Sequence, residues 1–164
     1  FKANRVFRQF KSISTDTIAT TDIEPVIAAC RNMSKSKTGA LIVIKRNNSL
    51  EFVKSSGDAM NVAVNQPILE SIFYKNSPLH DGAMLIEGNT ITATRVILPV
   101  SDDKKIPLRF GLRHRAAVGV SEKSDAVCLV VSEENGQISY LKDGDFVLYE
   151  TLEQLTEIIH KDLS

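Results

Sequence analysis

The sequence predicts a single α/β domain with a central mixed β-sheet and helices on both of its faces. Its length of 164 residues fits one domain, and its 43% hydrophobic and 24% charged residues are typical of a soluble globular protein. Segments with helical periodicity alternate with short apolar runs that tight turns connect, and such hairpins exclude a purely parallel sheet.

The first predicted elements are a helix and two strands. Apolar residues recur at spacings of three and four after a helix cap at Thr21 or Asp22, and we expect Gly39 to end this helix. The continuous apolar run over 40–44 predicts a buried strand, and a polar turn then leads into a second strand over 50–54.

Pro67 opens a second, short helix, which ends before Pro78. After it, Gly-Asn, Asn-Gly and Asp-Gly pairs mark tight turns between short apolar runs. The remaining predicted elements are strands over 83–86 and 90–98, a short helix over 112–119, strands over 126–131, 137–141 and 146–149, and an amphipathic helix over 152–163.

Residues 1–20 predict a basic amphipathic helix that precedes the main domain, residues 21–164. Such a helix either packs on the domain with a solvated basic face or lies next to a membrane, and the residues alone favour the first interpretation. The basic residues are Lys2, Arg5, Arg8 and Lys11, and the apolar residues between them are Val6, Phe7 and Phe10.

Composition and motif patterns exclude several classes of protein. Lys plus Arg and Asp plus Glu are 20 each, so the zero net charge argues against a nucleic-acid partner. The chain contains no run of 18 apolar residues, and its glycines match neither the P-loop nor the dinucleotide signature. Cys30 and Cys128 lie far apart in apolar surroundings, which predicts two buried free thiols.

The segment His80-Asp81-Gly82 is the first candidate site. An Asp-Gly pair is usually a turn, and Asp143-Gly144 needs no other interpretation. At residue 81, however, a histidine precedes the pair and an apolar strand follows it, and Asp and His both bind divalent cations. The residues alone leave a turn and a metal site open. A metal-dependent phosphohydrolase would need more histidines than the two others in the chain.

A basic segment is the second candidate site. Residues 104–115 carry five Lys or Arg residues and no acid, and Arg113 and Arg115 flank His114. A phosphate-rich ligand would explain this local charge, particularly at the start of a helix, where free N–H groups also bind anions. A solvated basic face is the alternative interpretation.

The third candidate is the segment Ser132-Glu133-Glu134, directly after a predicted buried strand. An acidic pair at this point is either part of a hairpin turn or, beside a phosphate site, a source of metal ligands.

Together these motifs resemble the diadenylate cyclase family, whose members make cyclic di-AMP. The two hallmark motifs of that family, Asp-Gly-Ala and Arg-His-Arg, stand here at 81–83 and 113–115, and the resemblance runs from about Thr21 to the C-terminal helix. Further matching segments are Thr38-Gly39-Ala40-Leu41, Ser77-Pro78-Leu79-His80, Leu98-Pro99, Ala116-Ala117-Val118-Gly119 and Val131-Ser132-Glu133-Glu134.

Two positions depart from the family pattern. Leu112 stands where many members have a threonine before Arg-His-Arg, and Ile97 stands where many have an aromatic residue before the Leu-Pro pair. The hydroxyl contact and the aromatic stacking of those members are therefore not expected here.

The resemblance implies a nucleotidyltransferase that joins two ATP molecules into cyclic di-AMP, releases two pyrophosphates and needs Mg²⁺ or Mn²⁺. It implies that Asp81 orients a ribose hydroxyl, holds the metal, or both, and that Arg113 and Arg115 clamp phosphates. The implied ATP-binding set is Gly82, Ala83, Leu98, Arg113, His114, Arg115, Ser132 and Glu133, and the implied metal set is His80, Asp81 and Glu133.

The resemblance also implies a homodimer that brings two ATP molecules face to face. The matching segments are most similar to the membrane-anchored branch of the family, in which transmembrane helices and a helical linker precede the cyclase domain on the cytoplasmic side of the cell membrane. Residues 1–20 would then be the end of that linker. A non-catalytic sensor that binds ATP or cyclic di-AMP is the alternative function, and a plain structural domain would leave the paired motifs unexplained.

Overall fold

The structure is a computed structural model that describes residues 20–101, 106 and 110–164. The helix predicted for residues 1–20 lies, apart from Thr20, outside the described residues, as do Lys104, Lys105 and Arg109 of the basic segment. None of the helices in the described ranges combines the length and the apolar character that crossing a membrane requires.

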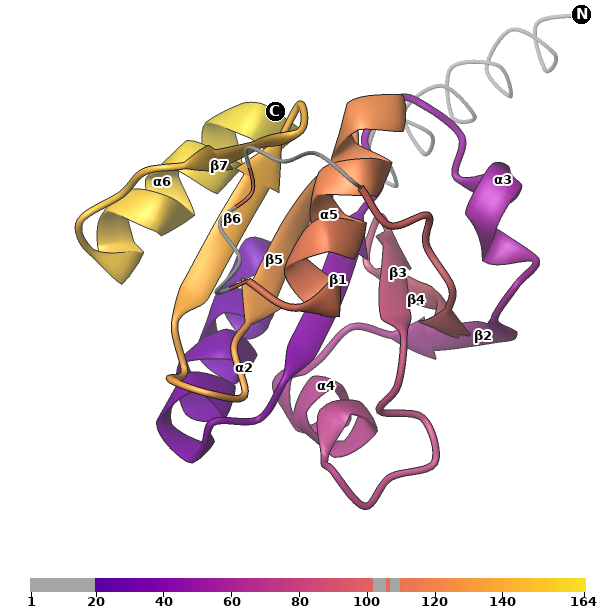
Figure 1. The fold of residues 1–164 in the computed structure, drawn as a ribbon, viewed down its shortest axis with the longest axis horizontal. Coiled ribbons are helices and arrows are strands. Elements are labelled where there is room, and N and C mark those ends of the chain that lie inside the picture. Colours follow the sequence, from indigo (N-terminus) through magenta and orange to yellow (C-terminus); the bar gives the residue numbers. More distant parts are fainter. Residues whose placement is uncertain (1–19, 102–105, 107–109) are drawn as a thin grey trace, which may run out of the picture.

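The described residues form one seven-stranded sheet with the order β2-β4-β3-β1-β5-β6-β7 (Figure 1). The central strands β1 and β3 are parallel, and every other neighbouring pair is antiparallel. The sheet is therefore mixed, as predicted. The strands are β1 (Ala40–Ile44), β2 (Asp58–Ala63), β3 (Ala83–Glu87), β4 (Thr90–Val96), β5 (Val127–Val131), β6 (Ile138–Lys142) and β7 (Asp145–Val147).

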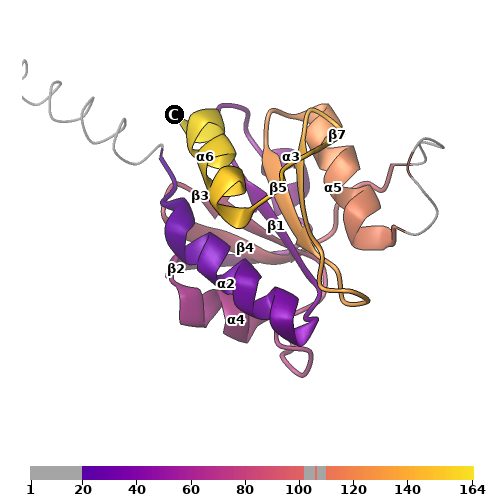
Figure 2. The ribbon, with the colours of Figure 1, turned by 90° about the vertical axis from the view of Figure 1, so that its left-hand side faces the viewer.

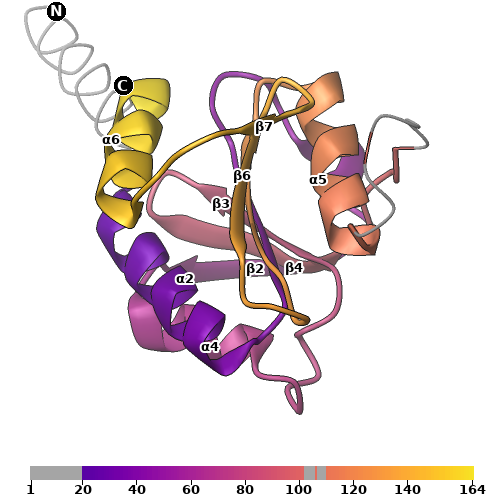
Figure 3. The same cartoon turned by 60° about the vertical axis from the view of Figure 1, so that its left-hand side comes forward.

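Helices cover both faces of this sheet, which confirms the predicted fold class (Figures 2 and 3). One face carries α2 (Ile23–Ser36), α4 (Gln66–Phe73) and α6 (Leu152–Leu163), and the other carries α3 (Glu51–Lys54) and α5 (Leu112–Lys123). Strand β1 is buried along its whole length because consecutive side chains point into the two opposite cores. Cys30 and Cys128 are buried free thiols, as predicted.

The predicted strand over 50–54 is wrong, because this segment contains the short helix α3. Leu50 and Val53 are both buried, and their spacing of three is helical, while Phe52 between them is exposed. The strand follows instead as β2, Asp58–Ala63, in which half-buried and exposed residues alternate but each set mixes polar and apolar residues. It pairs with β4 alone at the edge of the sheet, so its sequence carries a weak strand signal.

The end of the first helix also differs from the prediction. Helix α2 begins after Asp22, whose side chain accepts a hydrogen bond from the N–H of Glu24, and it ends before Lys37. Lys37 itself adopts the left-handed conformation that we assigned to a glycine cap. Gly39 therefore does not end the helix and stands directly before β1. Similarly, α5 continues four residues past the predicted end, to Lys123.

The strand directions bring four chain segments together at one end of the interior strands. Because β1 and β3 are parallel, the residues that precede them, Gly39 and Gly82, lie at the same end. Strands β4 and β5 run antiparallel to β3 and β1, so their carboxyl ends, Val96 and Val131, lie at that end too. All three candidate sites are placed by these strand ends and by the start of α5.

Candidate active site

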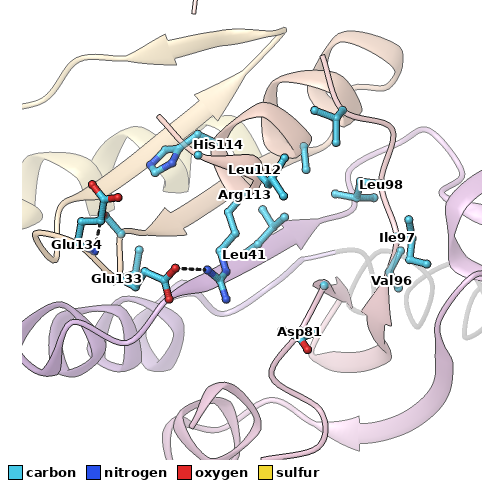
Figure 4. A pocket seen from close by; sticks show the side chains of 16 residues that line it. Leu41, Asp81, Val96, Ile97, Leu98, Leu112, Arg113, His114, Glu133 and Glu134 are labelled. Carbon is cyan, nitrogen blue, oxygen red and sulfur yellow. Dashed lines mark hydrogen bonds and ion pairs between the residues drawn. The ribbon is translucent and has the colours of Figure 1, made fainter. Parts of the chain in front are cut away.

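A cavity of about 500 Å³ opens at these ends of the interior strands, beside the start of α5 (Figure 4). One wall is apolar and the rest is polar. The apolar lining consists of Leu41, Val96, Ile97, Leu98, Val100, Leu112, Ala116 and Val131, and the polar lining is contributed by Asp81, Arg113, His114, Ser132, Glu133, Glu134 and the backbones of Gly82 and Gly111.

Asp81 and Gly82 form one side of the cavity. Gly82 has a φ of +79°, and a Cβ atom added there would lie 2.8 Å from the carbonyl carbon of Arg95 and from the carbonyl oxygen of Val96. Both the backbone conformation and the close approach to β4 therefore require glycine. This constraint presents the Asp81 side chain, 82% exposed, to the cavity, with its Oδ1 3.2 Å from Nε2 of His80.

Arg113 lies opposite Asp81, in the first turn of α5 (Figure 4). Its Nη1 atom is 3.6 Å from Oε1 of Glu133, which belongs to the turn after β5. Gly111 at the helix cap has no side chain that could satisfy the free N–H groups of the first turn, and no acid lies in that turn. The positive charge of the Arg113 guanidinium group and the positive end of the α5 dipole thus lie close together, which favours an anionic ligand.

His114 lines the cavity, but its ring is buried in an aromatic cluster. The ring centroid lies 4.7 Å from that of Phe110 and 6.2 Å from that of Phe146. Burial and, secondarily, the charge of Arg113 lower the pKa of His114 to about 4. The imidazole is therefore neutral near pH 7 and adds no positive charge to the cavity.

The turn after β5 supplies both a hydroxyl group and an acid. The Oγ atom of Ser132 accepts hydrogen bonds from the N–H groups of Glu134 and Asn135, at 3.2 and 3.4 Å. A serine hydroxyl that accepts still has its own proton to donate, so Ser132 can contact a ligand without giving up its role in the turn. The hairpin turn is therefore present, and it is compatible with the predicted ligand contact, which stays a prediction.

Most of the predicted site residues meet in this cavity, but three do not line it. Ala83 is buried in β3 beneath the cavity, paired with Val96. Arg115 follows Arg113 by two residues, and positions two apart do not share a helix face. His80 stands behind Asp81, where its Nδ1 is 2.8 Å from the carbonyl oxygen of Ser77.

The predicted metal set is only partly gathered. His80 and Asp81 are neighbours, while Glu133 lies with Arg113 on the other side of the cavity (Figure 4). Within the described ranges, no group of three or more His, Cys, Asp or Glu residues is arranged to hold a metal ion.

Sequence reasoning missed several residues of the apolar wall. Leu41 and Val131 belong to the neighbouring strands β1 and β5 and point to opposite faces of the sheet. Both line the cavity because they stand at the strand ends where it opens. Ile97 and Leu112 are 72% and 74% exposed, which is unusual for large apolar side chains. The apolar ends of the predicted strands could have indicated the first pair. The family resemblance had already marked positions 97 and 112, but the sequence contains no signal for their exposure.

The fold defines the chain as an α/β domain, and its site brings an arginine and a helix N-terminus beside apolar side chains, features that favour an anionic ligand. Residues 27–146 match the model of the family described as DisA bacterial checkpoint controller nucleotide-binding. The chain is 46% identical over 124 residues to the diadenylate cyclase CdaS of Bacillus thuringiensis and 39% identical over 140 residues to the cyclic di-AMP synthase CdaA of Bacillus subtilis. These alignments cover 76% and 85% of this chain.

Solved structures show the same similarity. A crystal structure of a DacA double mutant from Staphylococcus aureus has a TM-score of 0.82 and 42% identity, and the match covers 86% of this chain and 94% of that one. The chain therefore belongs to the diadenylate cyclase family. It spans 61% of the length of the CdaS relative and 51% of the length of the CdaA relative.

Proposed function

We propose that this domain is a diadenylate cyclase that condenses two ATP molecules into cyclic di-AMP. In each half of the reaction a 3′-oxygen bonds to the α-phosphorus of the other ATP, the bond from that phosphorus to pyrophosphate breaks, and the hydroxyl proton is released. The observation that carries the proposal is that Asp81 and Arg113 face one cavity in a chain of this family. A sensor would not need the carboxylate beside the nucleotide.

The phosphates of ATP would bind at the Arg113 side of the cavity. The guanidinium group, the first-turn N–H groups of α5 and the Ser132 hydroxyl all present donors there. The ion pair between Arg113 and Glu133 is largely exposed, since the Glu133 side chain is 67% exposed, so it contributes less than about 1 kcal/mol and is readily exchanged for a phosphate. Arg115 remains a predicted phosphate contact that this cavity alone does not use.

The adenine and ribose would occupy the apolar side. Leu41, Leu98 and Val131 line it with apolar side chains, and none of the described apolar lining residues is aromatic. Ile97 and Leu112 stand at the family positions of an aromatic residue and a threonine, so base binding here depends on burial of apolar surface. Gly82 leaves room for the ribose to approach the Asp81 carboxylate.

The residues on the Asp81 side fit a divalent cation that is shared with the substrate. A carboxylate and an imidazole are ligands that Mn²⁺ accepts, and Mg²⁺ is commonly held by one or two carboxylates together with substrate phosphates. Asp81 and His80 would hold the ion from this chain, and Glu133 would contribute from the opposite side. When bound, the cation offsets charge on the phosphates and lowers the pKa of the attacking hydroxyl.

We propose that catalysis needs a homodimer. The cavity beside Asp81 and Arg113 measures about 500 Å³, whereas a cavity between α2 and α6, about 250 Å³, lies among helices of the other face of the sheet. Cyclic di-AMP has twofold symmetry, and a twofold pair of domains would place each 3′-hydroxyl beside the α-phosphate in the partner's cavity. Most of the rate gain would then come from positioning the two nucleotides.

We further propose that residues 1–20 link the catalytic domain, residues 21–164, to a membrane anchor on the cytoplasmic side of the cell membrane. The support is the basic, phenylalanine-containing sequence of the linker and the 42% identity to a hypothetical membrane spanning protein from Bacillus cereus. Vesicles with anionic lipids test the linker. We expect residues 1–164 to bind them and residues 21–164 to bind them at least tenfold more weakly.

The activity is tested by incubating the chain with ATP and either Mn²⁺ or Mg²⁺ and separating the products by chromatography with mass detection. Cyclic di-AMP and pyrophosphate in a ratio of one to two are expected. The rate per chain should fall on dilution, because the active dimer dissociates. Intact ATP at high protein concentration, with nucleotide binding still measurable, would contradict the cyclase and support the sensor.

A further inference from the structure

Gly39 lies directly beneath the guanidinium group of Arg113. A Cβ atom added to Gly39 would lie 2.7 Å from Nη1, 2.8 Å from Cζ and 3.2 Å from Nη2 of Arg113, and these are its three nearest atoms. Gly39 is buried directly before β1, whereas Arg113 belongs to α5, more than seventy positions later. The missing side chain thus provides the space in which the guanidinium group rests.

The backbone does not require a glycine at this position. The residues with positive φ are Lys37, Arg95, Asp143 and four glycines, and Gly39 is not one of them among the described residues. The connection from α2 to β1 makes its left-handed turn at Lys37. An alanine would therefore fit the conformation at residue 39, and the one evident conflict would be with the guanidinium group.

Among the described residues, few other contacts define the position of Arg113. The Nε atom is buried and makes no hydrogen bond in the described part of the chain. The ion pair to Glu133 is 3.6 Å long, and the carboxylate is mostly exposed (Figure 4). A long arginine side chain loses substantial rotamer entropy when it is fixed, so an exposed ion pair alone would hold it weakly.

We propose that Gly39 is a positioning residue for Arg113, and through it for the phosphates of the bound nucleotide. A larger residue at 39 would push the guanidinium group off the floor of the site while leaving sheet and helix in place, because the atoms that must move are the end of a flexible side chain. The inference rests on the proposed nucleotide-binding function and assigns Gly39 a role that no motif analysis gave it.

The test is a double-mutant cycle of Gly39→Ala and Arg113→Ala, read by calorimetry with α,β-methylene ATP and by thermal unfolding. Gly39→Ala alone is expected to weaken binding about tenfold. In the Arg113→Ala background, where the guanidinium group is gone, the same substitution should change the dissociation constant less than about twofold. Any stability that Gly39→Ala loses should likewise be restored in the double variant.

Two results would overturn the proposal. One is an equal loss of affinity in both backgrounds, since Gly39 would then act independently of Arg113. The other is unchanged affinity in the single variant. Failure of the cyclase proposal looks different: the parent chain would bind the analogue and make no cyclic di-AMP, and the binding cycle would still be informative. A parent chain that does not bind the analogue would contradict both proposals.

Discussion

The guanidinium group of Arg113 and the carboxylate of Glu133 form an ion pair, Nη1 to Oε1 at 3.6 Å, that joins the start of α5 to the turn after β5. The pair places an acid at the position where we expect phosphates to bind. Glu133 is therefore either a competitor of the phosphates for Arg113 or, with a cation present, a ligand on the same side of the substrate. The two roles have opposite effects on nucleotide affinity.

Glu133→Gln is expected to tighten the binding of metal-free ATP by about two- to fivefold, because Arg113 loses its competing partner. The same variant should slow cyclic di-AMP synthesis in Mn²⁺ if Glu133 holds the cation. Glu134→Gln is the matched control, since Glu134 also lines the cavity but forms no ion pair within the described ranges. Equal affinities for the Glu133 and Glu134 variants would contradict the competition.

Asp81→Asn should lower the rate of cyclic di-AMP synthesis by about a hundredfold or more, because an amide is a poor ligand for the cation and a poor acceptor for the hydroxyl. The fold should be unaffected, since this side chain is 82% exposed. Asp143→Asn changes the other Asp-Gly pair, where φ is +54° and asparagine is well tolerated. Full activity of the Asp81 variant would refute the role assigned to it.

Gly82→Ala should destabilise the domain by about 1–3 kcal/mol, because alanine is strained at a φ of +79° and its Cβ would collide with the backbone of β4. Chemical denaturation measures this loss. Gly111→Ala provides the comparison: a Cβ there has open space around it, so the cost should stay below about 1 kcal/mol. A Gly82 variant as stable as the parent would mean that the strand ends adjust freely.

The buried imidazole of His114 predicts that acid destabilises the protein. Its pKa is about 4 in the folded state against 6.5 ordinarily, so between these values the unfolded chain binds a proton that the folded chain does not. The free energy of unfolding should therefore fall as the pH drops from 6.5 to 4, by at most about 3 kcal/mol from this residue. His114→Phe should remove this part of the pH dependence, and an unchanged slope would rule it out.

Much of the fold could be predicted from the sequence because most elements are long, strongly periodic or bounded by Gly and Pro. The exceptions have physical causes. Residues 50–54 are too few to distinguish a period of two from a period of three, and the edge strand β2 lacks a clear apolar face. Gly39 was assigned to a helix cap because a glycine after a helix is usually its cap, and only the fold brings Arg113 above it.

The site was predictable to the extent that its residues stand in contiguous motifs. Asp81, Arg113 and Ser132 come from three distant segments, and each motif taken singly had an ordinary explanation. Their convergence depends on strand order and direction, which local patterns do not specify. For Arg115 the motif alone was not enough. Its place in Arg-His-Arg predicts a site residue, but a position two residues after Arg113 lies on another face of the helix, and Arg115 does not line the cavity of its own chain.

The order of the sheet has a consequence for how the domain opens. The four strands whose ends shape the cavity occupy consecutive interior positions, while β2 and β7 form the two margins. Fraying begins where backbone groups pair on one side only, so amide hydrogens of the marginal strands should exchange with solvent long before those of β1 and β3. Local opening of the marginal strands would thus leave the four strands around the cavity paired, and only unfolding of the whole domain would separate them.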